Sequence, residues 1–319
     1  MRPPAIHCTD LRKTYHGKPP VDAVRGVDLE VREGECFGVL GPNGAGKTTT
    51  IEMLEGLIAP TSGTIEILGM RWSDQANAIQ QRIGISLQET RFSDKLTVRE
   101  TVTLFRSFYQ TGIEHTEAIA RVELQEKTDT WVKNLSGGQR QRLAVAVALV
   151  GDPKILFLDE PTTGLDPHSR RQVWEIVAAW RRQGRTTVLT THYMEEAERL
   201  CDRVAIIDHG RLFALGSPKE LIAQLGGEHV IEFSLQSSEA MTLPADSWLE
   251  LPAVTGCRYE NDAIHLSVAE PHVALPALLA KLAERNWHLA SLTTRHASLD
   301  DVFVVLTGRQ FEPEGETRS

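Results

Sequence analysis

Long apolar runs, paired cysteines and an excess of basic charge are all missing from this sequence of 319 residues. The longest apolar run near its middle is LAVAVALV, at residues 143–150. That run is far shorter than the roughly 20 residues that a membrane-spanning helix needs. The N-terminal stretch MRPPAIHCTD contains no apolar signal segment. We therefore expect a cytoplasmic protein that reaches the inner face of a membrane only through a partner.

Cysteine spacing and net charge exclude two further classes of protein. The four cysteines, Cys8, Cys36, Cys201 and Cys257, include no CxxC pair, so no zinc site is expected and the thiols should stay reduced. The formal net charge of −9 argues against a broad nucleic-acid surface, because such a surface needs clustered Lys and Arg. Hydrophobic residues make up 41% and charged residues 24% of the chain, which is ordinary for a globular protein with a sizeable core.

The apolar patterns predict alternating strands and helices. Short runs punctuated by Gly and charged residues predict strands between residues 5 and 39. A capping box formed by Thr97 and Glu100, followed by an apolar helix face, indicates a mainly helical region at about 88–150. The apolar runs KILFLDE (154–160) and RTTVLTTH (185–192) flank a helix-like stretch. Strand, helix and strand in this order predict a parallel sheet.

A change of pattern divides the chain into two predicted domains. GSPKELIAQLGGE, at 216–228, resembles a short helix that ends in glycines, and we place the end of a first domain, 1–225, within it. Residues 226–308 combine alternating strands with amphipathic helices and predict a small α+β domain. The polar tail, 309–319, is predicted to be disordered.

The first motif with chemical content is GPNGAGKT, at residues 41–48. It matches G-x-x-x-x-G-K-[ST] and lies between a predicted strand and a predicted helix. Its glycines permit backbone angles that turn amides inward around a phosphate. Lys47 would reach the β- and γ-phosphates, and Thr48 would offer its hydroxyl to Mg²⁺. A glycine-rich turn without a ligand is the alternative, but the strand–loop–helix context argues against it.

Acidic residues follow a buried strand in ILFLDEPTTGLDP. Asp159 is placed to hold Mg²⁺ through water, and Glu160 could polarise a water for attack on the γ-phosphate. His192 closes the next apolar strand and should lie near both acids if the two strands are neighbours. The alternative is a solvated acidic loop with a structural histidine, which the phosphate loop makes the weaker interpretation.

A second glycine-containing loop occurs in WVKNLSGGQRQRL, at residues 131–143. Ser136 and the amides of Gly137 and Gly138 precede a helical pattern, and the positive end of a helix holds phosphate well. This loop has no lysine of its own, although the first loop already has Lys47. The pattern suggests half of a second phosphate site.

Taken together, these motifs resemble the nucleotide-binding subunit of an ABC transporter over about residues 5–220. GPNGAGKTT resembles the Walker A loop, SLQE with Gln88 the Q-loop, and LSGGQ at 135–139 the family signature. ILFLDE resembles Walker B, GLD at 164–166 the D-loop, and His192 the switch histidine. No motif is degenerate, so we expect active hydrolysis. The implied fold is the α/β P-loop NTPase fold of ABC ATPases, with an antiparallel β subdomain and a helical subdomain, plus the small C-terminal α+β domain.

The resemblance also implies roles for individual residues. Tyr15 would stack on adenine. The Walker A loop would contribute Gly41, Pro42, Asn43, Gly44, Ala45, Gly46, Lys47, Thr48 and Thr49 to ATP binding. Mg²⁺ would be held by Thr48, Gln88 and Asp159, while Glu160, His192 and Gln88 would form the catalytic group. In a head-to-tail homodimer with two ATP molecules at its interface, Ser136, Gly137, Gly138, Gln139 and Asp166 would contact the partner's nucleotide or interface.

The C-terminal part resembles a subtype of the family. THYMEEAERLCDRVAIIDHGRLFALGSP and SLDDVFVVLTGR are similar to daunorubicin-resistance-type exporter ATPases, which pair with separate ABC-2-type permeases. The prediction is thus an ATPase subunit that powers export of a drug, antibiotic, lipid or polysaccharide. Two alternatives are a soluble ABC-type ATPase acting on DNA or ribosomes and a non-catalytic nucleotide-binding module. The chain has no coiled-coil or zinc insertion and no second cassette, and its Walker B and signature motifs are intact, so neither alternative is favoured.

Overall fold

The computed structural model describes residues 4–88, 90–236, 244–260 and 262–307. These residues form two compact units, which meet in the sequence between Leu215 and Gly216. The tail predicted to be disordered, 309–319, lies outside the described residues. In the described part of the chain, no helix combines the length and apolar character needed to cross a membrane.

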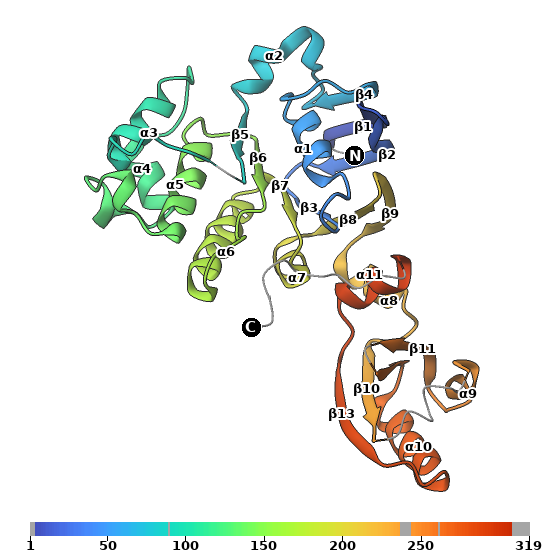
Figure 1. Ribbon diagram of the computed structural model, residues 1–319. Helices are drawn as coiled ribbons and strands as arrows, with labels where there is room; N and C mark the ends of the chain where they lie inside the picture. The colour runs from blue at the N-terminus through green and yellow to red at the C-terminus, as the bar shows by residue number, and fades with distance from the viewer. Residues whose placement is uncertain (1–3, 89, 237–243, 261, 308–319) are drawn as a thin grey trace. The chain divides into compact units, whose positions relative to one another are not determined.

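Strands and helices alternate through the first unit (Figure 1). Its strands are β1 (Pro4–Tyr15), β2 (Val21–Arg32), β3 (Cys36–Leu40), β4 (Ser62–Ile67), β5 (Ile83–Ser86), β6 (Ile155–Asp159), β7 (Thr186–Thr191), β8 (Arg203–Asp208) and β9 (Arg211–Gly216). Its α-helices are α1 (Lys47–Leu54), α2 (Trp72–Gln80), α3 (Val98–Arg106), α4 (His115–Arg121), α5 (Gly137–Leu149), α6 (Pro167–Arg182) and α7 (Met194–Leu200). The strands predicted between residues 5 and 39 are confirmed, as is the capping box at the start of α3.

A six-stranded sheet positions the motif residues. Its strand order is β5-β6-β7-β3-β8-β9, and the neighbours from β5 to β8 are parallel. The predicted strand–helix–strand unit is confirmed, because β6 and β7 pair directly on either side of α6 in the sequence. Every residue of β3, β6 and β7 is buried, as is usual where helices or other layers cover both faces of a parallel sheet. The carboxyl ends of these three strands therefore meet at one edge, where ligands bind in open α/β sheets.

A smaller antiparallel sheet, of order β2-β1-β4, shares a core with one face of the six-stranded sheet. Ile51 and Leu54 of α1 pack in that core with Ile6 from β1 and with Phe37 and Phe157 from the larger sheet. Figure 1 shows α3, α4 and α5 grouped on the opposite side of the six-stranded sheet from β1, β2 and β4. The fold class predicted for this part, an α/β P-loop fold with β and helical subdomains, is confirmed.

The second unit is a four-stranded antiparallel sheet with helices. Its elements are α8 (Pro218–Ala223), β10 (His229–Leu235), α9 (Asp246–Leu249), β11 (Val254–Glu260), β12 (Ala263–Val268), α10 (Pro271–Glu284), β13 (Leu289–His296) and α11 (Leu299–Thr307). From β10 to β13 the order is βαββαβ, and the sheet order is β11-β12-β10-β13. This is the ferredoxin-like arrangement, which confirms the predicted α+β class.

A buried aspartate fastens α11 within the second unit. Asp301 is 1% exposed and accepts hydrogen bonds from Arg295, Arg258 and the Ser298 amide. Burial alone would raise the pKa of this carboxyl, but these hydrogen bonds outweigh burial and hold the pKa well below its usual range. A charge buried this deeply is tolerated because it is paired and hydrogen-bonded.

The first unit contains a buried carboxyl without such partners. Glu55, at the end of α1, is 3% exposed, and neither of its oxygens has a hydrogen-bond partner among the described residues. Burial, followed by the negative charges of Asp159 and Glu52, raises its pKa from 4.5 to about 8. At pH values between 4.5 and about 8, the carboxyl of Glu55 therefore takes up a proton when the chain folds. The stability that neutral Glu55 allows is fully present below pH 4.5 and is lost as pH rises through about 8.

We expect Glu55→Met to raise the free energy of unfolding by about 1–3 kcal/mol at about pH 8, because an unpaired buried polar group is replaced by an apolar one. Near about pH 5 the gain should be much smaller, since Glu55 is then neutral in the folded chain. Urea unfolding at both pH values measures this difference. The exposed Glu33 offers a matched control, Glu33→Met, which should shift stability by no more than about 0.5 kcal/mol. An equal gain at both pH values for Glu55→Met would contradict the assignment.

Candidate active site

The loop between β3 and α1 is tightly packed against neighbouring backbone. A Cβ atom added at Gly41 would lie 2.1 Å from the carbonyl oxygen of Ile207, and one at Gly46 would lie 2.4 Å from that of Ala23. Gly46 also has a φ of 98° and is the N-cap of α1, so it needs both the space and the left-handed backbone that glycine provides. The sequence thus builds a close-fitting loop at the amino end of a helix.

Lys47 lies folded over this loop. Its side chain is 4% exposed, and Nζ donates hydrogen bonds to the carbonyl oxygens of Gly41 (2.8 Å) and Pro42 (3.2 Å). Nζ also lies 3.6 Å from Oε1 of Glu160. Burial lowers the pKa of Lys47, while the charges of Glu160 and Asp159 oppose that shift. The Lys47 amine is therefore held beside the carboxylate of Glu160, the residue that directly follows β6.

Glu160 is the meeting point of four segments. Its Oε2 accepts hydrogen bonds from Gln88 Nε2 (3.2 Å) and Thr163 Oγ1 (3.0 Å) and lies 3.2 Å from Nδ1 of His192. The neighbouring His192 imidazole lowers the pKa of this carboxyl against the opposing effect of burial, and Lys47 also lowers it. Glu160 therefore stays ionised at neutral pH. Its backbone φ of 46° lies in the left-handed region, which is unusual for a residue other than glycine.

Asp159 lies behind Glu160. It is 5% exposed, and its Oδ1 accepts a hydrogen bond from the Thr190 hydroxyl of β7. Burial raises its pKa, Thr190 and Lys47 oppose the shift, and Glu160 adds to it. Asp159 does not line the cavity described next, and its contact with a metal through water stays a prediction.

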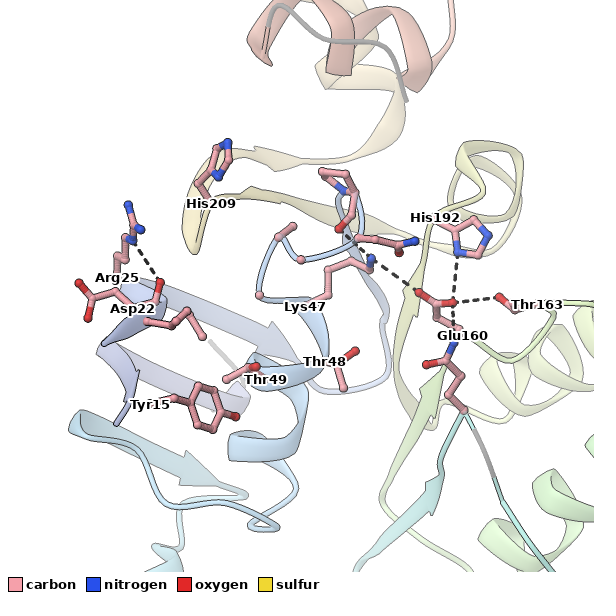
Figure 2. Close-up of a pocket in the computed structure, with 18 of the residues that line it drawn as sticks. Tyr15, Asp22, Arg25, Lys47, Thr48, Thr49, Glu160, Thr163, His192 and His209 are labelled. Atoms are coloured by element: carbon pink, nitrogen blue, oxygen red, sulfur yellow. Dashed lines mark hydrogen bonds and ion pairs between the residues drawn. The ribbon is translucent and has the colours of Figure 1, made fainter. Parts of the chain in front are cut away.

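These groups line a cavity of about 820 Å³. The predicted residues that line it are Tyr15, Pro42, Asn43, Gly44, Ala45, Gly46, Lys47, Thr48, Thr49, Gln88, Glu160 and His192. Figure 2 shows Glu160 between Lys47, Thr163 and His192, with Tyr15 on the far side of the cavity beside Thr49. Tyr15 is 41% exposed at the end of β1, so its ring is available to a planar ligand. The tertiary structure brings this set together from positions as far apart as 15 and 192.

Several lining residues were not predicted. Asp22 and Arg25 come from β2, Thr163 and Tyr193 follow the β6 and β7 strands, and His209 lies in the turn after β8. The triad Asp-His-Gly at 208–210 indicates only a turn. No spacing in the sequence relates Arg25 or His209 to the phosphate loop. Their nearness to it depends on where β2 and the turn after β8 lie in the fold.

Other predicted residues lie outside the cavity. Ser136 is the N-cap of α5 and forms a capping box with Gln139, in which Ser136 Oγ accepts from the Gln139 amide at 3.3 Å. Asp166 is the N-cap of α6 and accepts hydrogen bonds from the amides of His168 and Ser169. The remaining predicted residues outside the cavity lining are Gly41, Gly137, Gly138 and Asp159. A single chain therefore does not place the second loop in its own cavity.

The two glycines of the second loop differ in their surroundings. A Cβ atom added at Gly138 would lie 2.4 Å from Oγ of Ser169, so packing against α6 requires glycine there. A Cβ atom at Gly137 would meet no atom within 4 Å. Gly137 is the first residue of α5, directly after the N-cap Ser136. The packing of the described chain gives no reason for Gly137, although close approach of a ligand or partner would.

A set of three or more His, Cys, Asp and Glu residues arranged to hold a metal ion does not occur among the described residues. The cavity instead offers single oxygen donors, the exposed hydroxyl of Thr48 and the amide oxygen of Gln88. Oxygen donors suit Mg²⁺, which commonly combines one or two protein ligands with substrate phosphates. The donor set therefore fits a magnesium ion that arrives with a nucleotide.

Comparison with known proteins identifies a family and relatives that match almost the whole chain. A family model described as ABC transporter matches residues 24–163. Nod factor export ATP-binding protein I of Cupriavidus metallidurans is 40% identical over 312 residues, covering 96% of this chain and 98% of the relative. The protein of the same name from Rhizobium etli is 37% identical over 316 residues, covering 97% and 95%. The similarity thus extends through both units.

Solved structures resemble the larger part of the chain. The structure of an ATP-binding subunit of an ABC transporter aligns with a TM-score of 0.63 at 27% identity, covering 70% of this chain and 93% of that chain. A dimeric ATP-binding cassette in a post-hydrolysis state, bound to ADP and Pi, aligns with a TM-score of 0.60 at 25% identity, covering 66% and 98%.

Proposed function

The chain belongs to the ABC transporter family as an ATP-binding, ATP-hydrolysing subunit, and from this premise we propose that it powers export through a separate ABC-2-type permease. The observation that carries the chemical part is the convergence of Lys47, Gln88 and His192 on Glu160 at one end of the cavity. The relatives described above are named as Nod factor export proteins. We extend export, though not that cargo, to this chain.

We propose that ATP lies in the cavity with its adenine toward Tyr15 and its phosphates on the loop before α1. Tyr15 and Glu160 line opposite sides of this cavity (Figure 2). Backbone amides at the start of α1 would hold the phosphates, assisted by the positive end of the helix. Lys47, which now contacts carbonyl oxygens of its own loop, would turn to the β- and γ-phosphates.

Thr48 and Gln88 would hold Mg²⁺ directly, and Asp159 would hold it through water. When bound, the ion would neutralise charge on the phosphate oxygens. Gln88 donates to Glu160 in the present arrangement, and both residues line the cavity. This residue can therefore serve either group by a side-chain rotation.

Glu160 is proposed as the general base. A carboxylate kept ionised by His192 and Lys47 can accept a proton from a water that attacks the γ-phosphate. His192 orients this carboxylate through the 3.2 Å contact and can turn to the γ-phosphate when it is present. The chain's own residues thus bind the phosphates, orient the base and take up the proton.

We propose that Ser136, Gly137, Gly138, Gln139 and Asp166 act on the nucleotide of a second copy in a head-to-tail homodimer. Ser136 is exposed at the amino end of α5, and the space beside Gly137 is open. An exposed helix start with open space beside it suits a phosphate brought by a partner. The similarity to a dimeric cassette supports this arrangement.

The domain limits complete the proposal. We assign residues 1–225 to the ATPase domain, with its helical subdomain at about 88–150. Residues 226–308 would form an accessory domain, which the ferredoxin-like order of β10 to β13 supports. In this proposal the permease selects the cargo, and the ATPase does not contact it.

We propose that the permease docks on an aromatic row formed by Phe92, Phe105 and Phe108. Phe92, Phe105 and Phe108 stack edge to face, with ring centroids 5.7 and 5.8 Å apart, and Phe108 is 64% exposed. Leu104, on the same helix α3, is 46% exposed. Neighbouring apolar side chains on a surface commonly mark an interaction site. This row begins four residues after Gln88, so a partner seated there could affect the Gln88–Glu160 contact.

We expect Phe108→Glu to prevent recovery of the chain with its permease in the membrane fraction, because a charge would replace the most exposed ring of the row. ATP turnover of the purified variant should stay near that of the unchanged protein. Leu57→Glu is the matched control, since Leu57 is 52% exposed and lies in the turn that follows α1. Unchanged membrane recovery of Phe108→Glu, or recovery of the unchanged protein with ribosomes or DNA instead, would overturn this assignment.

A further inference from the structure

A completely buried glutamate lies behind the active site. Glu196, in α7, is 0% exposed, and its Oε1 accepts hydrogen bonds from Thr162 Oγ1 (2.9 Å) and Trp174 Nε1 (2.8 Å). Burial raises its pKa, while the hydrogen bonds from Trp174 and Thr162 oppose that shift. The second oxygen, Oε2, is buried without a hydrogen-bond partner among the described residues. A polar group this deeply buried carries a large desolvation cost unless it is hydrogen-bonded. Its partners therefore determine what Glu196 does in the fold.

Glu196 connects the two segments that carry Glu160 and His192. Its partner Thr162 follows Glu160 by two positions, and the adjacent Thr163 donates to Glu160 Oε2 at 3.0 Å. Glu196 itself lies four positions after His192, and its amide donates to the carbonyl oxygen of Tyr193 at 3.1 Å. Its carboxylate thus joins the loop after β6 to the start of α7, just after His192.

Helix α6 is the third segment in this group. Trp174, buried at 4% exposure, reaches Glu196 from α6. One turn earlier, the Arg170 guanidinium lies 4.3 Å from the centroid of the Tyr193 ring, which in turn is 4.2 Å from that of His192. The start of α6 is capped by Asp166. The segment from His192 into α7 therefore has two contacts with α6, through Tyr193 and through Glu196.

We propose that Glu196 is a positioning residue for ATP hydrolysis, which holds the segments of Glu160 and His192 in register through its hydrogen bonds with Thr162 and Trp174. The proposal rests on the roles proposed above for Glu160 and His192. Two loops at the ends of neighbouring strands can move independently, and a shift of about 1 Å between reacting groups can lower a rate about a hundredfold. A shared buried acceptor removes that freedom. The simpler alternative is that Glu196 only fastens α7 to α6 and affects stability alone.

Two substitutions at Glu196 separate these possibilities. Glu196→Met removes the acceptor, and we expect kcat for ATP hydrolysis to fall about tenfold or more, with KM and nucleotide affinity changed less than about threefold. Glu196→Gln keeps an oxygen that can accept from Thr162 and Trp174, and it should restore kcat to within about threefold of the unchanged protein. Glu195→Met is the matched control, because Glu195 is the exposed neighbour on α7.

Substitutions of Thr162 and Trp174 provide a test that remains possible if Glu196→Met does not fold. Thr162→Val removes one donor and keeps the shape of the side chain, and Trp174→Phe removes the other donor and leaves a smaller aromatic ring. Each should lower kcat with KM unchanged. If the residues act as one unit, Thr162→Val combined with Glu196→Met should be no slower than Glu196→Met alone. Where Glu196→Met does not fold, the two partner variants decide the question.

The proposal is overturned if Glu196→Met or both partner variants keep full kcat, or if lost activity follows only lost thermal stability. It is also overturned if Glu196→Gln is as slow as Glu196→Met. The roles proposed for the site are tested separately by Glu160→Gln. If Glu160→Gln abolishes turnover and Glu196→Met does not reduce it, only the positioning role fails, whereas normal turnover in Glu160→Gln removes the basis of both.

Discussion

Glu160→Gln is expected to reduce ATP turnover about a hundredfold or more, because general-base catalysis contributes about 10²–10⁴-fold. Glutamine has the same shape but cannot accept a proton from the attacking water. It also removes a negative charge from the place where the γ-phosphate would lie, so ATP binding should be retained. Phosphate release measures turnover, and size-exclusion chromatography with ATP measures dimerisation.

A second result is expected from the same variant. If ATP joins two subunits and hydrolysis releases them, Glu160→Gln should accumulate as an ATP-bound dimer. The same substitution at Glu175, an exposed residue of α6, is the matched control and should leave turnover and dimerisation unchanged. Normal turnover in Glu160→Gln, or the absence of a dimer with ATP, would show that the assigned mechanism is wrong.

Ser136→Arg is expected to abolish dimerisation and turnover while leaving ATP binding to the monomer largely intact. Ser136 is exposed outside the cavity of its own chain, so a large side chain there need not disturb the bound nucleotide. In the proposed dimer the arginine would occupy the space of the partner's γ-phosphate and displace the backbone amides that contact it. Equilibrium binding of a fluorescent ATP analogue, together with phosphate release, measures both outcomes.

Loss of the helix cap must be separated from this effect. Ser136 accepts the Gln139 amide in a capping box, and removing such a cap costs about 1 kcal/mol. Ser217 forms the same capping box with Glu220 at the start of α8, so Ser217→Arg removes an equivalent cap elsewhere. That control should keep its turnover. Turnover surviving in Ser136→Arg would exclude action of this loop on a partner's nucleotide.

Local sequence patterns were sufficient to predict the main elements of the ATPase fold. The loop 41–49 was predictable because its glycines, its lysine and the flanking strand and helix are contiguous. The parallel pairing of β6 and β7 followed from one strand–helix–strand stretch, and it placed His192 beside Glu160, where the structure shows a 3.2 Å contact. Each inference used interactions between residues close in sequence, for which periodicity and spacing are informative.

Some residues of the cavity wall could be identified only from the tertiary structure. Arg25 and His209 line it, yet neither belongs to a motif, because Arg25 lies within β2 and His209 follows β8, two strands of different sheets. Glu55 is a similar case, since nothing in its neighbourhood of the sequence indicates that its carboxyl is buried without a partner. Burial depends on what the other sheet and helices cover, which a local pattern does not contain.

The sequence by itself determined which chemical groups this protein has for phosphate binding and hydrolysis, because each group lies within a short contiguous motif. Only the tertiary structure decided how they are held. Thr162, Trp174 and Glu196 are far apart in the sequence but meet at one buried oxygen, and Ser136 lies outside the cavity of its own chain. Such contacts arise when separate elements pack into a common core, and each depends on the whole fold for its distance and its desolvation.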